Sequence, residues 1–257
     1  MAEPGVSGRR VRVAPDAPAL TRAAAEEVVR RAESAVAERG RFAIALSGGA
    51  TPQPLHALLA DPNEPFRGRI PWKRTHVFFG DERHVPPDQP ESNYGMARAT
   101  LLAKVPIPEE NVHRMRGEID APSAAAQYEV ELRRVLGGPG DAVPRLDLAL
   151  LGLGGDGHTA SLFPGSPALR ETARLVAAPW VEHLGTHRIT LTLPVLGAAR
   201  AIVFLVSGEK KAARAADVLE GDGAALPAGR VRPSDGDLLW MLDAPAASLL
   251  RGPLERI

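Results

Sequence analysis

Apolar residues along the chain gather in short runs of strand length that alternate with longer stretches of helical spacing. Near-continuous apolar runs lie at residues 41–46, 75–79, 146–151, 201–206 and 238–242, and an alternating run lies at 187–193. Helical spacing occurs at residues 20–39, 93–103, 123–136 and 210–220. Strands that are apolar at nearly every position are typical of a parallel sheet with helices on both faces. The pattern therefore predicts an α/β fold with a largely parallel sheet.

The chain is predicted to form a single domain. Its 257 residues show no internal repeat and no shift in composition that would mark a boundary. A chain of this length buries roughly three quarters of the surface that its unfolded form exposes, so it needs no disulfide or structural metal to hold a core. The 25 glycines and 24 prolines are scattered between the periodic segments, where they indicate turns and not a disordered linker.

Charge and cysteine content exclude several classes of function. The 31 Lys and Arg residues equal the 31 Asp and Glu residues, so we expect no nucleic-acid partner. The absence of cysteine removes thiolate nucleophiles and Cys-ligated zinc, and it fits a reducing compartment. No stretch approaches the roughly 20 apolar residues that span a bilayer, and residues 1–10 lack the apolar segment of a signal peptide. We therefore expect a cytoplasmic protein with no membrane partner.

The loop at 47–52 follows a predicted strand and precedes a helix expected to begin near Gln53. Ligands of open α/β sheets bind outside the carboxyl ends of the strands, where this loop lies. It carries the hydroxyls of Ser47 and Thr51 and two glycines, Gly48 and Gly49, that allow backbone N–H groups to approach a ligand. A phosphate could bind here at the helix N-terminus, although an ordinary tight turn fits the motif as well. No Gly-Lys-Ser/Thr follows, so it is not a Walker loop.

Four consecutive ionisable side chains follow the next strand, at residues 81–84. A solvated loop could contain them, but their place at a strand end points to the ligand cleft, where Asp81 and Arg83 could orient a polar ligand. Ser92 and Asn93 come shortly afterwards, and we interpret them as the N-cap of the next helix in preference to ligand contacts.

The segment 152–158 formally satisfies the Gly-x-Gly-x-x-Gly pattern of dinucleotide-binding proteins. We reject that interpretation because Asp156 would place a carboxylate beside the pyrophosphate, and because Pro164 and Gly165 stop the long helix that the motif requires. A histidine held by a carboxylate is instead the usual arrangement for general-base catalysis, which makes His158 with Asp156 a candidate pair. A surface histidine is the alternative. Because no Gly-x-Ser-x-Gly elbow occurs, water would be the nucleophile of any hydrolysis.

Two further features carry weaker signals. His183 and His187 are spaced four residues apart, but they lack the Glu of a zinc-protease motif and enclose a helix-weakening glycine, so we predict no metal site. After the strand at 201–206, Lys211 lies in the first turn of a predicted helix. It could supply a charge to a phosphate, or it could simply begin a solvated helix.

Five separated motifs occur in an order that resembles the glucosamine-6-phosphate isomerase/6-phosphogluconolactonase family. They are LSGGATP at 46–52, FFGDERHVPPDQPESNYGMARATLL at 78–102, LDLALLGLGGDGHTASLFPGS at 146–166, RITLTLP at 188–194 and SGEKK at 207–211. The resemblance covers about residues 20–242. Its most specific part is the lactonase-like segment DGHTASLFP at 156–164. It implies a Rossmann-like sheet and hydrolysis of 6-phospho-D-glucono-1,5-lactone to 6-phospho-D-gluconate, in the oxidative pentose phosphate pathway. It also implies that no cofactor or metal is needed.

Carried over to this chain, the resemblance implies that His158 is the catalytic histidine, with Asp156 beside it, and that Arg83 helps to hold the lactone. The phosphate contacts would fall on the loop from Ser47 through Gly48 and Gly49 to Thr51, with positive charge from Arg188 and Lys211. Lys210 stands where a small or variable residue is usual, so Lys210 and Lys211 could exchange roles. The tail after Leu242 shows no usable motif.

Two alternatives remain at this point. A sugar-phosphate isomerase/deaminase would share several loops and would use Asp81 as a base, but Asp-Glu-Tyr would be expected where this chain has Arg83. A non-catalytic sugar-phosphate-binding protein is the second alternative, which the retention of Asp156 and His158 disfavours. The expected partner is a small-molecule sugar-phosphate lactone, and the chain is expected to be a monomer or a small homo-oligomer.

Overall fold

The computed structural model describes residues 9–137 and 142–257. Most of the amino-terminal segment that we used to expect a cytoplasmic protein lies outside these residues. Within the described ranges, no helix is long and apolar enough to cross a membrane.

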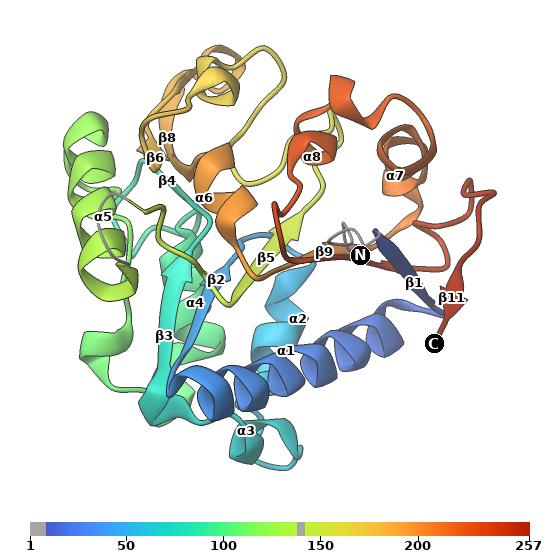
Figure 1. Ribbon diagram of the computed structural model, residues 1–257, viewed down its shortest axis with the longest axis horizontal. Coiled ribbons are helices and arrows are strands. Elements are labelled where there is room, and N and C mark those ends of the chain that lie inside the picture. The colour runs from blue at the N-terminus through green and yellow to red at the C-terminus, as the bar shows by residue number, and fades with distance from the viewer. Residues whose placement is uncertain (1–8, 138–141) are drawn as a thin grey trace, which may run out of the picture.

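A seven-stranded parallel sheet forms the centre of the protein (Figure 1). Its strands, in spatial order, are β11 (Glu255–Arg256), β1 (Arg10–Ala14), β10 (Asp237–Asp243), β9 (Ala201–Val206), β5 (Leu148–Gly152), β2 (Phe42–Leu46) and β3 (Thr75–Phe79). Each neighbouring pair runs parallel. The α/β class and the largely parallel sheet predicted from the apolar runs are therefore confirmed.

Helices cover both faces of this sheet, each over its own hydrophobic core. One face carries α1 (Ala17–Arg39), α2 (Pro52–Ala60), α3 (Phe66–Arg69) and α4 (Asn93–Thr100), and the other carries α5 (Ala121–Leu136), α6 (Leu193–Ala198), α7 (Ala212–Glu220) and α8 (Pro227–Arg230). In Figure 1, α1 to α3 lie below the strands and α6 to α8 above them. Short 3-10 turns connect these elements at Trp72–Arg74, Leu102–Lys104, Glu109–Asn111, Pro167–Arg170, Glu182–Leu184, Glu209–Lys211 and Gly223–Ala225.

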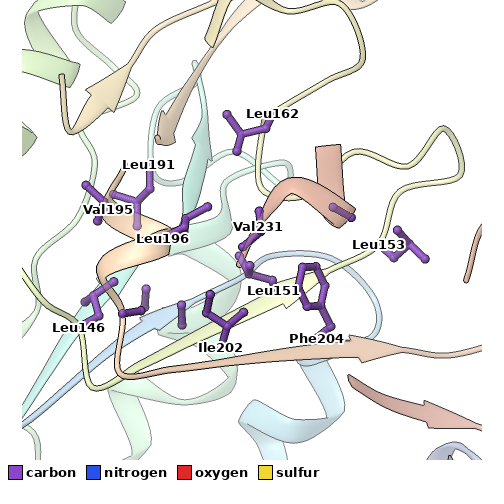
Figure 2. Packing of buried hydrophobic residues seen from close by; sticks show 14 of the residues in the cluster. Leu146, Leu151, Leu153, Leu162, Leu191, Val195, Leu196, Ile202, Phe204 and Val231 are labelled. Carbon is purple, nitrogen blue, oxygen red and sulfur yellow. The ribbon is translucent and has the colours of Figure 1, made fainter. Parts of the chain in front are cut away.

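The two-residue period of a strand explains why the central strands are apolar throughout. In β9, Ile202 and Phe204 belong to one core, whereas Val203 and Leu205 belong to the other. Figure 2 shows the first of these cores, in which Ile202 and Phe204 lie close to Leu151 of the neighbouring β5. The ring of Phe204 also stacks on Trp240 with 3.9 Å between centroids.

A second, antiparallel sheet stands beside the first, at the upper left of Figure 1, and the apolar pattern did not indicate it. It contains β4 (Asp81–Arg83), β8 (Thr186–Leu191) and β6 (Val176–Ala177), while β7 (Trp180–Val181) also pairs with β8. The predicted strand at 187–193 is therefore confirmed as a strand but lies outside the parallel sheet. Residues 81–83, expected as a loop, form a strand because their backbone pairs with β8 from more than 100 residues further along the chain.

The ends of several elements differ from the prediction by a few residues. Helix α1 begins earlier than expected because the carboxylate of Asp16 accepts a hydrogen bond from the backbone N–H of Ala19 and caps the helix. The predicted N-cap at Ser92 is confirmed, since its hydroxyl accepts from the backbone N–H of Gly95 at 3.0 Å. Strands β1 and β11 were missed because both are short and carry exposed charged residues.

Candidate active site

A cavity of about 590 Å³ opens at the carboxyl ends of β2, β5 and β9 and reaches β4, which follows the end of β3. These strands are neighbours in the parallel sheet, so the loops that follow them meet at one edge. Every site residue predicted from the sequence lines this cavity: Ser47, Gly48, Gly49, Thr51, Asp81, Arg83, Asp156, His158, Arg188 and Lys211. Lys210 is exposed and does not line it, so the geometry favours Lys211 of the two lysines.

The imidazole of His158 is fixed by Asp156. Nδ1 of His158 lies 2.6 Å from Oδ1 of Asp156, and the same oxygen accepts the backbone N–H of His158 at 3.1 Å. Burial opposes ionisation of Asp156, but the hydrogen bonds and charge of His158 outweigh burial and hold the pKa of Asp156 below its ordinary value. The carboxylate is therefore ionised at neutral pH and orients the ring.

Two neighbours limit how the ring of His158 can turn. The ring of Phe163 lies against it with 4.4 Å between centroids. On another side, Gly154 comes so near that a Cβ there would stand 2.1 Å from Nδ1 of His158. The glycine-rich loop after β5 thus makes room for the imidazole. The sequence did not indicate this contact of Phe163, because it depends on the turn between the two residues.

Asp81 is buried beneath the cavity and has two side-chain partners. Its Oδ2 accepts from the hydroxyl of Ser161 at 2.7 Å, and its Oδ1 accepts from Nδ2 of Asn93 at 3.1 Å. Asn93 comes so close to Gly48 that a Cβ on that glycine would lie 1.8 Å from Oδ1 of Asn93. Gly48 therefore makes room for a side chain, a role that its sequence motif did not indicate. Asn93 and Ser161 also line the cavity and were missed as site residues.

Glu82 points to the other side of β4 and attaches helix α4 to it. Its carboxylate accepts the backbone N–H groups of Asn93 at 2.7 Å and Tyr94 at 2.8 Å, together with the hydroxyl of Ser92. Burial raises the pKa of Glu82, although the backbone hydrogen bonds oppose this shift. The N-terminal turn of α4 is thereby held so that Asn93 reaches the cavity.

Two arginines meet at one edge of the cavity. Arg83 of β4 and Arg188 of β8 are direct partners in the antiparallel pairing, and both line the cavity. Burial, followed by the charge of Arg83, lowers the pKa of Arg188 from its ordinary value. Like charges placed directly opposite each other destabilise a sheet. An anion bound to Arg188 would reduce that repulsion, which makes this edge suited to a negatively charged ligand.

The loop that carries Lys211 is held by a residue from the far end of the chain. Asp243, the last residue of β10, accepts from the hydroxyl of Ser207 and from the backbone N–H of Gly208 at 3.0 Å. Ser207 itself lines the cavity. No motif pointed to the tail after Leu242, because this contact exists only once β9 and β10 are paired.

His183 and His187 have different surroundings. His183 lines the cavity and meets the edge of Phe163, whereas the ring of His187 packs against Trp180. Over residues 9–137 and 142–257, no group of three or more His, Cys, Asp or Glu side chains is arranged to hold a metal ion.

The comparisons with known proteins agree with this geometry. The model of the glucosamine-6-phosphate isomerase/6-phosphogluconolactonase family matches residues 15–240. The 6-phosphogluconolactonase of Nostoc sp. is 40% identical over 245 residues, which are 94% of this chain and 98% of that protein. The human 6-phosphogluconolactonase is 42% identical over 241 residues, 92% of each chain. The chain belongs to this family.

The fold of this chain is also similar to that of a solved 6-phosphogluconolactonase. The structure of 6-phosphogluconolactonase from Trypanosoma brucei superposes with a TM-score of 0.84 at 30% identity and covers 95% of this chain and all of that one. The family membership predicted from the five motifs is therefore confirmed, and the matched residues nearly coincide with the predicted range 20–242.

Proposed function

We propose that this chain is an enzyme that hydrolyses 6-phospho-D-glucono-1,5-lactone to 6-phospho-D-gluconate. The observation that carries the proposal is a carboxylate-held histidine, His158, in one cavity with the cations Arg83, Arg188 and Lys211. A histidine that can act as a base, in the same cavity as a group of positive charges, fits a lactone that bears a phosphate. The names of the Nostoc, human and trypanosomal relatives support the same substrate.

In this mechanism, His158 activates the attacking water. A proton on Nδ1, donated to Asp156, leaves Nε2 free to take a proton from water as its oxygen bonds to C1 of the lactone. The tetrahedral intermediate then collapses with cleavage of the bond between C1 and the ring oxygen. The imidazolium returns its proton to that oxygen, which becomes the 5-hydroxyl of the product. Asp156 stabilises the imidazolium while it exists.

The phosphate is bound away from the reacting carbon. We assign it to Arg188 and Lys211 and to the loop from Ser47 to Thr51, whose backbone N–H groups precede helix α2. A fixed phosphate restricts the orientation of the lactone ring, so that C1 meets His158. Arg83 is assigned to the lactone itself.

Asp81 is assigned to the sugar hydroxyls. Ser161 and Asn93 each donate to one of its two oxygens, and a carboxylate has further lone pairs that can accept from a ligand. A buried acceptor of this kind favours a polyhydroxylated ring over an apolar ester. No observation favours the isomerase/deaminase or the purely binding alternative.

The first experiment measures 6-phosphogluconate formation from freshly generated lactone, coupled to a dehydrogenase and corrected for spontaneous opening. We expect faster decay with the protein than in the blank, and no ammonia from glucosamine 6-phosphate. Decay equal to the blank would refute the proposal, and release of ammonia would favour the isomerase/deaminase. The cytoplasmic location, the lack of a nucleic-acid partner and the monomeric or small homo-oligomeric state stay predictions.

A further inference from the structure

The residue that follows His158 has a buried hydroxyl with no partner. Thr159 is only 1% exposed, and its Oγ1 makes no hydrogen bond. A buried unpaired hydroxyl destabilises the folded protein, because it has lost its hydrogen bonds to water without gaining others. Thr159 also lines the cavity. Among the cavity-lining residues that the structure describes, it is the one with a buried side-chain polar atom left unpaired.

The neighbouring hydroxyls show that this environment can supply partners. Ser161, two residues further on, donates to Asp81 at 2.7 Å. Thr190 on β8 accepts the backbone N–H of Ser161 at 3.2 Å and donates to the carbonyl of Leu191. These two buried hydroxyls thus have defined partners within the protein. The hydroxyl of Thr159 is the exception, and it is the one next to the proposed base.

The backbone around Thr159 is held in an unusual conformation. Ala160 has a φ of 47°, the one positive value of a non-glycine residue in the described part of the chain. The turn is closed by a hydrogen bond from the backbone N–H of Leu162 to the carbonyl of Thr159 at 3.0 Å. Left-handed backbone at a residue with a Cβ is unfavourable and is concentrated at functional sites. Thr159 itself is β-branched, so its side chain has little rotamer freedom.

We propose that the hydroxyl of Thr159 donates a hydrogen bond to the carbonyl oxygen of the lactone. This inference rests on the proposed lactone hydrolysis. Thr159 lines the same cavity as His158, so a lactone whose C1 meets His158 brings the substituents of that carbon into the space that Thr159 borders. The carbonyl oxygen is the substituent that gains negative charge during the attack. A rigid donor with no other partner stabilises such an oxygen without first giving up a bond of its own.

The test compares Thr159→Val, which replaces the hydroxyl by a methyl group, with Thr159→Ser, which keeps it. We expect kcat of Thr159→Val to fall about 100-fold with little change in KM, as for loss of one donor to a developing oxyanion. Thr159→Ser should retain most of the activity. Because the unpaired hydroxyl is removed, Thr159→Val should also unfold at a higher urea concentration than the wild type.

Thr192 provides a matched control. It is equally buried, but its hydroxyl donates to the carbonyl of Arg174 at 2.8 Å, and it does not line the cavity. Thr192→Val should therefore lose stability and keep its activity, the opposite of Thr159→Val.

Three results would overturn the inference. If Thr159→Val keeps the wild-type kcat and KM, the hydroxyl does not contact the substrate. If KM rises while kcat is unchanged, the contact is not made to the oxygen that gains charge. If Thr159→Val is less stable than the wild type, the hydroxyl has a partner within the protein. A wild type that leaves the lactone decay at the blank rate refutes the proposed function, whatever the variants do.

Discussion

Because His56 is buried, we expect the stability of the folded protein to fall as the pH is lowered below neutrality. His56 lies in the middle of α2, which begins at the proposed phosphate loop, and it is completely buried. Neither ring nitrogen has a hydrogen-bond partner. Burial alone lowers the pKa of His56 from 6.5 to about 4, because a protonated imidazole would lose its hydration without gaining a partner.

The direction of this pH dependence follows from the number of protons that the folded and the unfolded protein bind. Between pH 6.5 and pH 4 the imidazole of the unfolded chain is protonated, whereas the folded protein keeps it neutral. Lowering the pH through this range therefore stabilises the unfolded chain and lowers the free energy of unfolding. One pKa unit corresponds to about 1.4 kcal/mol. The contribution of His56 is then a loss of about 2 kcal/mol at pH 5 and about 3 kcal/mol at pH 4, relative to pH 7.

Urea unfolding at pH 7, 6 and 5 measures this loss in the wild type and in His56→Leu. His76 and His113 also have lowered pKa values, caused first by burial, so the wild-type slope contains their contributions as well. The difference between the two proteins isolates His56. We expect the variant to lose about 2 kcal/mol less between pH 7 and pH 5. His56→Gln, which cannot titrate either, should show the same weaker slope. Equal losses in all three proteins would show that His56 does not contribute to the pH dependence.

Two further predictions concern the cavity. Arg188→Ala combined with Lys211→Ala should raise KM for the phosphorylated lactone by about 100-fold, with a smaller effect on kcat, because charge-assisted hydrogen bonds to the phosphate are lost. An unaltered KM in steady-state kinetics would remove both residues from the phosphate site. Gly48→Ala should lower stability by about 2 kcal/mol, because its Cβ would meet the side chain of Asn93. Gly155→Ala, with no atom within 4 Å of the added Cβ, is its control in the same urea experiment, and equal stability of the two variants would contradict the assignment.

The sequence predicts the parallel sheet well because its strands are buried on both faces. A strand such as β9 is apolar at each of its positions and ends at a glycine-containing turn, so local pattern is sufficient. The second sheet is different. Its strand β4 consists of three charged residues, and only pairing with β8 makes it a strand. Local propensity cannot show a partner that lies about a hundred residues away.

The site also combines residues that local motifs indicate with residues whose role depends on distant contacts. Loops at strand ends carry recognisable motifs, so the residues at 47–51, 81–83 and 156–158 could be chosen from the sequence. Asn93 could not be recognised as a site residue from the sequence. Its side chain reaches the cavity because Gly48 has no Cβ there and because the buried carboxylate of Glu82 holds the backbone of Asn93. The loop that carries Lys211 is held by a hydrogen bond from the backbone N–H of Gly208 to Asp243, which lies outside every recognised motif.

Substitution of the proposed base, His158, tests the hydrolytic mechanism. Decay of fresh 6-phosphogluconolactone is followed with wild type, with His158→Ala and without protein, and binding of 6-phosphogluconate to both proteins is measured by calorimetry. We predict that kcat of His158→Ala falls about a thousandfold, as for loss of a general base, while product affinity stays within a factor of about three. Wild-type kcat in His158→Ala would contradict the assignment of His158 as the base.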